Sequence, residues 1–379
     1  MSRAAAPGTR HEVRALLLSA VVAVAIVLAA PTGATTPQPP IKHVFVIVLE
    51  NESYASTFGD PAADPYLAHT LPSKGALLTQ YYGTGHESND NYISMISGQG
   101  PNPQNQGDCQ VYDDFVGTGP SAVDGQAVGQ GCVFPQSVQT IANQLSENGL
   151  TWKGYMEDMG NVSTRESSTC GHPALDSQDG TQTPVAGDGY VSRHDPFVYF
   201  HSIIDDQSYC DAHVVRLDAA KTDFTRASTT PNFSFIVPNL CDDGHDYPCT
   251  NEPTPETSAV DDTDKFLETW VPRITGSPAF KKDGLLVITF DESEGPQSDA
   301  TACCNESAGP NSPLPGITGM GGGRVGAVLL SPFIKPGTVS SRPYNHYGLL
   351  GSIEDLFGLP RLGYAATTSS TFGPDVYTK

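Results

Sequence analysis

Oxygen-bearing side chains follow directly on two apolar runs of this chain. The run VFVIVL leads into Glu50 and Asn51, and the run LLVITF leads into Asp291 and Glu292. Continuous apolar, β-branched runs are typical of strands covered on both faces, as in a parallel sheet. In open α/β sheets, ligands bind beyond the carboxyl ends of the strands. The sequence therefore predicts that these four side chains gather at one edge of a sheet.

This set of oxygen donors indicates a hard cation. Carboxylate and amide oxygens suit Ca²⁺, Mg²⁺, Mn²⁺ or a borderline Zn²⁺ site, whereas a thiolate site would need cysteines. Three carboxylates crowded together without a cation would repel and raise one another's pKa. The alternative is that each carboxylate is a solvated cap after its strand. Two such pairs, each after a strand, favour the divalent cation.

Ser88 lies between His86 and Asn91, at the start of an expected helix that includes residues 92–97. A hydroxyl there is close to the free N–H groups of a helix N-terminus, which favour an anion such as phosphate. Serine is also a common N-cap residue, which is the structural alternative. Asn91 would either donate to a phosphoryl oxygen or complete the turn.

Two further histidines follow predicted strands or precede a helix. His245 lies in a short acidic loop, and His346 lies at the start of the last expected helix. Histidine in such a place binds metal, donates to a phosphoryl oxygen or protonates a leaving group. Each alone could be an ordinary surface histidine. We expect His86, His245 and His346 at the same sheet edge, which favours a functional role.

The elements that must position these residues alternate between strands and helices. This alternation predicts a mostly parallel sheet between two layers of helices. No linker divides the chain after residue 34, so we expect a single domain over 35–379. Further strands are expected at 151–156, 232–237 and 325–330, and helices at 66–74, 137–148, 262–274 and 347–357.

The first 34 residues have the pattern of an export signal, with three arginines, an apolar stretch and small residues near the expected cleavage site. The alternative is an uncleaved anchor, although the stretch is shorter than the roughly 20 residues that a span needs. A formal net charge of −22 argues against nucleic acid or an anionic membrane surface as a partner. We therefore expect a secreted monomer with no membrane segment in its mature chain.

All eight cysteines follow the leader, and in an oxidising compartment an even number favours disulfides. Two pairings are plausible, Cys109 with Cys132 and Cys241 with Cys249. A bridge between the neighbours Cys303 and Cys304 would be strained. We therefore expect each of these two to pair elsewhere or to have no partner that the sequence can assign.

Several blocks together resemble the bacterial phosphoesterase family, which contains secreted acid phosphatases and phospholipases C and belongs to the alkaline-phosphatase-like superfamily. The resemblance runs from about residue 41 to 366 and implies a three-layer α/β/α sandwich. The blocks are Glu50-Asn51, His86-x-Ser88-x-x-Asn91-Tyr92, Asp243-Gly244-His245-Asp246, Thr289-Phe290-Asp291-Glu292 and the segment 346–360, with a weaker match at Arg193-His194-Asp195-Pro196-Phe197.

The resemblance implies a mechanism. Ser88 would be the nucleophile, forming a phosphoseryl intermediate, and Asn91 would donate to a phosphate oxygen. His86, His245 and His346 would line the phosphate and protonate the leaving oxygen. The divalent cation, whose identity stays open, would be held by Glu50, Asn51, Ser88, Asp291 and Glu292.

Two departures from the family pattern stand out. The family block usually has prolines beside the nucleophile, and here Glu87 and Asn89-Asp90 replace that arrangement, which predicts a less rigid loop. Cys241 stands where close relatives have an aspartate, and a bond to Cys249 would brace the loop of His245.

Three functions are consistent with these residues. A phosphomonoesterase of the acid phosphatase type comes first, and a phospholipase C or another phosphodiesterase second. The partner would then be a phosphate ester, either a small molecule or a phospholipid. The third is a secreted cation-dependent binding protein without turnover, which the presence of Ser88, Asn91 and three histidines disfavours.

Overall fold

A computed structural model describes residues 38–59, 62, 64–122, 124–250, 258–368 and 370–378. From Pro37 onward the described residues form one compact unit. The predicted export signal and its boundary with the domain lie outside the described residues. No helix in the described part of the chain combines the length and apolar character needed to cross a membrane.

The centre of the fold is an eight-stranded sheet in the order β13-β2-β12-β11-β1-β10-β7-β9. Only β12 runs antiparallel to its neighbours, so the predicted mostly parallel sheet is confirmed. The strands are β13 (Thr338–Ser340), β2 (Ala76–Leu78), β12 (Ala327–Leu330), β11 (Gly284–Phe290), β1 (His43–Leu49), β10 (Phe233–Val237), β7 (Trp152–Met156) and β9 (Val214–Arg216).

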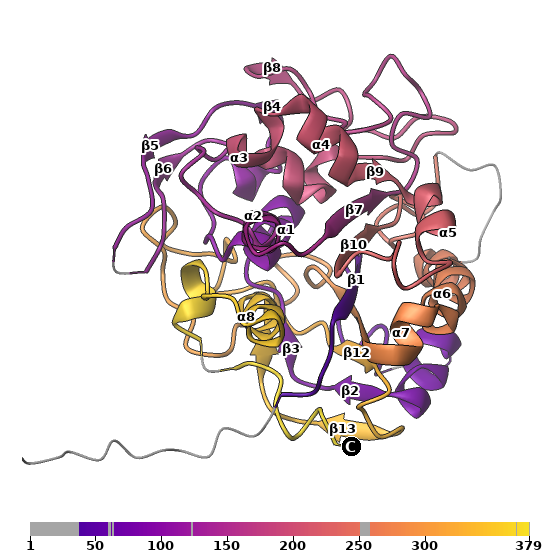
Figure 1. Ribbon diagram of the computed structural model, residues 1–379. Coiled ribbons are helices and arrows are strands. Elements are labelled where there is room, and N and C mark those ends of the chain that lie inside the picture. Colours follow the sequence, from indigo (N-terminus) through magenta and orange to yellow (C-terminus); the bar gives the residue numbers. More distant parts are fainter. Residues whose placement is uncertain are drawn as a thin grey trace, which may run out of the picture. The chain divides into compact units, whose positions relative to one another are not determined.

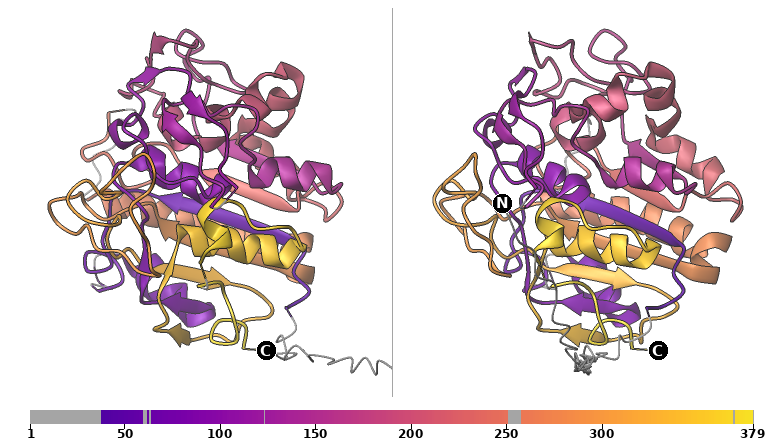
Figure 2. Two further views of the ribbon diagram at one scale, coloured as in Figure 1. Left: turned by 90° about the vertical axis from the view of Figure 1, so that its left-hand side faces the viewer. Right: turned by 60° about the vertical axis from the view of Figure 1, so that its left-hand side comes forward.

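Helices cover both faces of this sheet (Figure 1). On one face lie α1 (Ser88–Ser97), α2 (Ile141–Glu147) and α8 (His346–Phe357), and on the other lie α5 (Ala220–Asp223), α6 (Ala259–Gly276) and α7 (Pro278–Asp283). Figure 2 shows α8 lying along the sheet. Both central strands, β1 and β11, are buried at every position because both faces are covered. The expected three-layer α/β/α architecture is confirmed.

The remaining elements are short. Three two-stranded sheets pair β14 with β3, β4 with β8, and β5 with β6. Their strands and the two other α-helices are β3 (Tyr81–Tyr82), β4 (Val111–Tyr112), β5 (Val116–Thr118), β6 (Val128–Gln130), β8 (Ser177–Gln178), β14 (Tyr344–Asn345), α3 (His201–Ile204) and α4 (Gln207–His213).

Two predicted helices differ from those observed. The helix expected over 66–74 is instead a π-helical turn, Tyr66–Thr70, followed by a 3₁₀ turn, Pro72–Lys74. Pro72 has no backbone N–H to donate, so one α-helix cannot run through it. The helix expected from residue 137 begins at Ile141, because Thr140 and Asn143 form a capping box there.

Four disulfides link the cysteines. Cys109–Cys132 and Cys241–Cys249 form as expected, and Cys170–Cys210 is a third bond. The expectation for the adjacent pair is wrong, because Cys303 and Cys304 bond to each other. The other six cysteines are paired among themselves, so these two neighbours have no other partner.

A carboxyl group is buried inside α8. Glu354 Oε1 accepts a hydrogen bond from Leu362 N at 2.8 Å, while Oε2 is buried without a hydrogen-bond partner in the described structure. Burial raises the pKa of Glu354 from 4.5 to about 9. The folded state therefore keeps a proton that the unfolded chain releases above about pH 4.5, and stability falls as the pH rises between these two values.

We expect Glu354→Gln to stabilise the protein by roughly 2 kcal/mol near pH 7, because glutamine keeps the acceptor and has no proton to lose. The gain should nearly vanish at about pH 4.5, where both states of the wild type carry the proton. Chemical denaturation at both pH values measures this difference. The exposed Glu147→Gln serves as control, and a pH-independent effect at Glu354 would contradict the prediction.

Candidate active site

The carboxyl ends of β1 and β11 bring the first two acidic stretches together. The two strands are parallel with Leu49 opposite Phe290, so Glu50 and Asp291 leave the sheet side by side. Asp291 Oδ1 accepts hydrogen bonds from Asn51 N at 3.0 Å and from Glu292 N at 2.6 Å. The predicted meeting of these residues at one sheet edge is confirmed.

Ser88 is buried at the first position of α1, 2% exposed. Its Oγ donates to Glu50 Oε2 at 2.8 Å. The N-cap position belongs to Glu87, so the N-cap alternative for Ser88 is wrong. The hydroxyl is thus turned toward the sheet edge, where an activating group can act on it.

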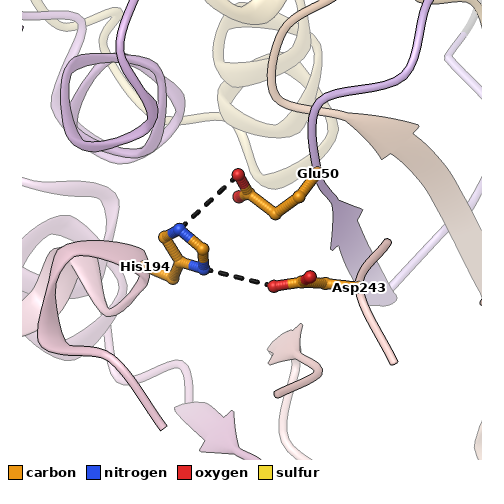
Figure 3. Close-up of side chains that lie close together, drawn as sticks. All are labelled: Glu50, His194 and Asp243. Carbon is orange, nitrogen blue, oxygen red and sulfur yellow. Dashed lines mark ion pairs between the residues drawn. The ribbon is translucent and has the colours of Figure 1, made fainter. Parts of the chain in front are cut away.

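His194 joins this cluster, although the sequence assigned it no role. Its Nε2 lies 3.5 Å from Glu50 Oε2, the same oxygen that Ser88 contacts, and its Nδ1 lies 3.3 Å from Asp243 Oδ2. Figure 3 shows the imidazole between the two carboxylates. Its ring stacks on Tyr92 of α1, with centroids 5.1 Å apart, which holds the ring in this orientation.

A main-chain hydrogen bond to Glu50 holds Asp243 beside the cluster. Asp243 follows β10, and its carbonyl accepts the N–H of Glu50 at 2.8 Å. The disulfide Cys241–Cys249 closes the surrounding loop, which is the bracing expected for the loop of His245. A third strand end therefore contributes a carboxylate to the same edge.

The predicted histidines His86 and His346 are buried, and both contact residues that follow β11. His86 Nδ1 pairs with Glu292 Oε2, and its Nε2 donates to the carbonyl of Asp299 at 3.0 Å. His346 Nε2 donates to the carbonyl of Asp291 at 2.6 Å, and its Nδ1 accepts from a tyrosine hydroxyl. Both rings therefore hold the acidic segment in place, and their predicted contact with phosphate stays a prediction.

His245 lies at the outer edge of the site, with 29% of its side chain exposed. Its Nδ1 donates to Asp246 Oδ1 at 2.7 Å, and its Nε2 faces Arg193 Nη2 at 3.3 Å. Of the three predicted histidines it is the one that solvent reaches.

Asn91 braces the loop before Ser88. Its Oδ1 accepts from Thr84 N and Gly85 N at 2.8 and 3.0 Å, and its Nδ2 donates to the carbonyls of Gly85 and Glu87 at 2.9 and 3.2 Å. These bonds tie Thr84, Gly85 and Glu87 to the first turn of α1. The turn-completing alternative thus accounts for its contacts, and the phosphate-donor role stays a prediction.

The electrostatics of the cluster favour a cation. Burial, followed by the charges of Asp291 and Asp243, raises the pKa of Glu50 well above its usual range. Burial likewise raises the pKa of Asp243, and that of Asp291 to about 6. Glu50 Oε1, Asp243 Oδ2 and Asp291 Oδ2 are buried without hydrogen-bond partners in the described structure. Orphaned carboxylate oxygens of this kind are what a bound cation would satisfy.

The ligand geometry also fits. Ligand atoms of Glu50, His194 and Asp243 all lie within 4.8 Å of one another, and all three residues are buried. Two carboxylates with one imidazole suit Mn²⁺, Zn²⁺ or Mg²⁺. His194 is neutral, as a metal ligand must be, because burial lowers its pKa well below the usual value.

An insertion also contacts the helix of Ser88. Asp108 Oδ1 accepts from the backbone N–H of Asn89 at 3.0 Å, and its other oxygen faces Arg193 Nε at 3.6 Å. The disulfide from Cys109 to Cys132 anchors this segment. Asp108 therefore caps the free N-terminal end of α1 from outside and fixes the position of Ser88.

We expect Asp108→Ala to lower kcat of a reaction at Ser88 by about tenfold with KM within about twofold, because the helix start loses its acceptor. Asp108→Asn keeps an oxygen at the same place and should restore most of kcat. Steady-state kinetics of both variants, beside Asp114→Ala in the same insertion, test this. Equal losses in the alanine and asparagine variants would contradict a positioning role.

The sequence missed His194 and Asp243 for a physical reason. Asp243 follows a recognised strand, but His194 lies in a 3₁₀ turn, Ser192–His194, with no strand before it. Its only signal was the weaker block Arg193-His194-Asp195-Pro196-Phe197. The contact between His194 and two strand ends exists only once the loop folds over the sheet edge.

Comparison with known proteins gives consistent results. A model of the Phosphoesterase family matches residues 60–360. The phosphate-repressible acid phosphatase of Penicillium chrysogenum is 27% identical over 336 residues, which cover 86% of this chain and 63% of that protein. The phosphatidylinositol-3-phosphatase of Mycobacterium tuberculosis is 23% identical over 335 residues, covering 88% of this chain and 82% of that protein.

This chain spans 59–63% of the length of the fungal acid phosphatases that it matches. Among solved structures, a protein in the alkaline phosphatase superfamily from Vibrio parahaemolyticus is similar with a TM-score of 0.50 at 14% identity, covering 86% of this chain and 68% of that one. That likeness supports the expected alkaline-phosphatase-like fold. Because the family model matches residues 60–360, well over half of the chain, the chain belongs to the Phosphoesterase family.

Proposed function

We propose that this protein is a secreted phosphoesterase that depends on a divalent cation and attacks phosphomonoesters through Ser88. The observation that carries the proposal is the 2.8 Å hydrogen bond from Ser88 Oγ to Glu50 Oε2, inside a cluster of buried carboxylates with orphaned oxygens. A buried hydroxyl beside a cation-binding carboxylate is arranged as an activated nucleophile.

The cation would be held by Glu50, His194 and Asp243, with Asp291 beside them. When bound, a divalent cation lowers the pKa of a neighbouring hydroxyl and neutralises charge on phosphoryl oxygens. Asn51 and Glu292 remain predicted ligands. The strong negative charge of the chain, −22, would otherwise repel an anionic substrate, so a local positive charge also serves binding.

The residues of the chain then have defined tasks. Glu50 orients Ser88 Oγ, and the N-terminal N–H groups of α1 other than that of Asn89, which Asp108 accepts, would offer donors to the phosphoryl oxygens. As Oγ passes its proton to Glu50 Oε2, a bond forms between Oγ and phosphorus while the ester bond to the leaving oxygen breaks, and that oxygen takes a proton. We assign this proton transfer to His245, since it is the partly exposed histidine at the edge. Attack of water on the phosphoserine then releases phosphate.

The preference for monoesters rests on the relatives. The two relatives compared above are named as an acid phosphatase and a phosphatidylinositol-3-phosphatase. Secretion is supported by the export-signal pattern of the leader and by four disulfides, which form in oxidising compartments.

A substrate panel tests the proposal. The full protein should hydrolyse p-nitrophenyl phosphate with a kcat/KM at least about 100-fold above that for bis-p-nitrophenyl phosphate, a difference of about 2.7 kcal/mol. Faster cleavage of the diester or of phosphatidylcholine would replace the monoesterase by a phosphodiesterase or phospholipase C. No turnover of any ester, with each of Mg²⁺, Mn²⁺, Ca²⁺ and Zn²⁺ supplied, would favour the binding-protein function.

A further inference from the structure

One pocket of the described structure has walls that do not include the cluster around Ser88. Its volume is about 480 Å³, and its walls come from the loop 304–310, the start of α8, the 3₁₀ turn Gly363–Ala366 and the insertion that contains Asp124. None of the residues Ser88, Glu50 or Asp243 lines it. It therefore does not form part of the proposed phosphoryl site.

The pocket is acidic. The described residues that line it include Asp124 and Glu306, and among them there is no lysine, arginine or histidine. Glu306 Oε1 accepts from the amide of Asn345, while Oε2 is buried and has no hydrogen-bond partner among the residues that the structure describes. Burial raises the pKa of Glu306 well above its usual range. A buried carboxylate of this kind is stabilised by a positive charge placed beside it.

The pocket is also aromatic. Tyr347 and Tyr364 both line it, and their rings meet edge to face with centroids 5.3 Å apart and an interplanar angle of 75°. The face of an aromatic ring attracts cations, and the attraction is strongest when water is excluded. Prolines at positions 101, 310 and 315 complete the apolar part of the wall.

We propose that this pocket binds a small organic ammonium ion, with Glu306 supplying the counter-charge and Tyr347 and Tyr364 supplying aromatic faces. An inorganic cation would need several oxygen ligands at short distance. An anion would meet two carboxylates and no basic group. A methylated or primary ammonium group matches both the charge and the apolar, aromatic surface.

The pocket shares part of its wall with the loop before Ser88. Thr84 lines the pocket and donates its N–H to Asn91 Oδ1 at 2.8 Å. Pro315 also lines it, and its carbonyl accepts the N–H of His86 at 3.3 Å. The ammonium ion would thus lie next to the loop that precedes the proposed nucleophile, without contacting the reacting atoms.

Calorimetric titration of the full protein with choline and with its uncharged isostere 3,3-dimethylbutan-1-ol tests the proposal without any variant. Choline should bind at least about tenfold more tightly than the isostere, because only choline carries the positive charge. Equal affinity for both, or no binding of choline up to about 20 mM, would overturn the proposal.

Variants locate the site. Glu306→Gln and Tyr364→Leu should each weaken choline binding by at least about tenfold, whereas Tyr364→Phe keeps the ring and should bind as the wild type does. Glu147→Gln, which removes an exposed carboxylate elsewhere, and Ser88→Ala should leave binding unchanged. Since Ser88→Ala is the test of the hydrolytic site, the two proposals can fail separately. Wild-type affinity in folded Glu306→Gln and Tyr364→Leu, verified by circular dichroism, would overturn this one.

Discussion

Replacing Ser88 by alanine is expected to lower kcat for p-nitrophenyl phosphate by at least about 10³-fold, the largest effect of any single substitution in this chain. Its hydroxyl lies 2.8 Å from Glu50 Oε2 in the buried cluster. KM should change little, since alanine removes the reacting atom and leaves the surrounding donors. Steady-state kinetics on protein whose unfolding midpoint matches the wild type measures the loss.

A matched control lies on the same helix. Ser97 is also buried, and its hydroxyl donates to the carbonyl of Ile93 at 2.7 Å, away from the acidic edge. Ser97→Ala should keep kcat within about twofold. Acid quenching of a reaction with labelled substrate should trap phosphate on the Ser88 peptide in the wild type only. Near-wild-type turnover by Ser88→Ala would exclude Ser88 as the nucleophile.

Removing the proposed divalent cation, or the carboxylate that touches both Ser88 and His194, should produce the second-largest loss of activity. We expect Glu50→Gln to lower kcat/KM by at least about 10²-fold, because a cation in such a site contributes several kcal/mol to the transition state. Dialysis against a chelator should reduce wild-type activity by a similar factor, and added Mn²⁺, Mg²⁺, Ca²⁺ or Zn²⁺ should restore it. The metal that restores most activity identifies the working ion.

The control for this change is a glutamate that follows the neighbouring strand, β11. Glu294 is exposed and accepts a hydrogen bond from Ser53 at 2.8 Å, outside the cluster. Glu294→Gln should keep both activity and metal content. Metal analysis of the Glu50→Gln protein should show reduced occupancy whatever its activity. Chelator-resistant turnover by the wild type would remove the cation from the mechanism.

Much of the fold follows from local patterns. The apolar runs before Glu50 and Asp291 are fully buried strands because only a sheet covered on both faces accepts such runs. Parallel strands end at the same edge, so the meeting of Glu50 with Asp291 could be predicted without coordinates. The start of α1 at Ser88 was also close to expectation.

Side-chain partnerships were much less predictable. The contacts of Asn91 could not be predicted, because they depend on where the carbonyls of Gly85 and Glu87 point. The bond between Cys303 and Cys304 depended on how the other six cysteines paired. Such outcomes depend on contacts between segments far apart in sequence, which no local periodicity encodes.

By itself, the sequence determined the parallel sheet, its acidic edge and the placement of Ser88 at a helix start. Short apolar runs indicate buried strands, and their alternation with helices indicates that the strands are parallel. Only the tertiary structure decided which groups complete that edge. His194, which lies in a 3₁₀ turn, contacts Glu50 and Asp243. Asp108, which lies in an insertion closed by a disulfide, contacts α1. Loops have no repeating pattern that indicates where they fold, so their contacts with the sheet edge appear only when the whole chain is packed.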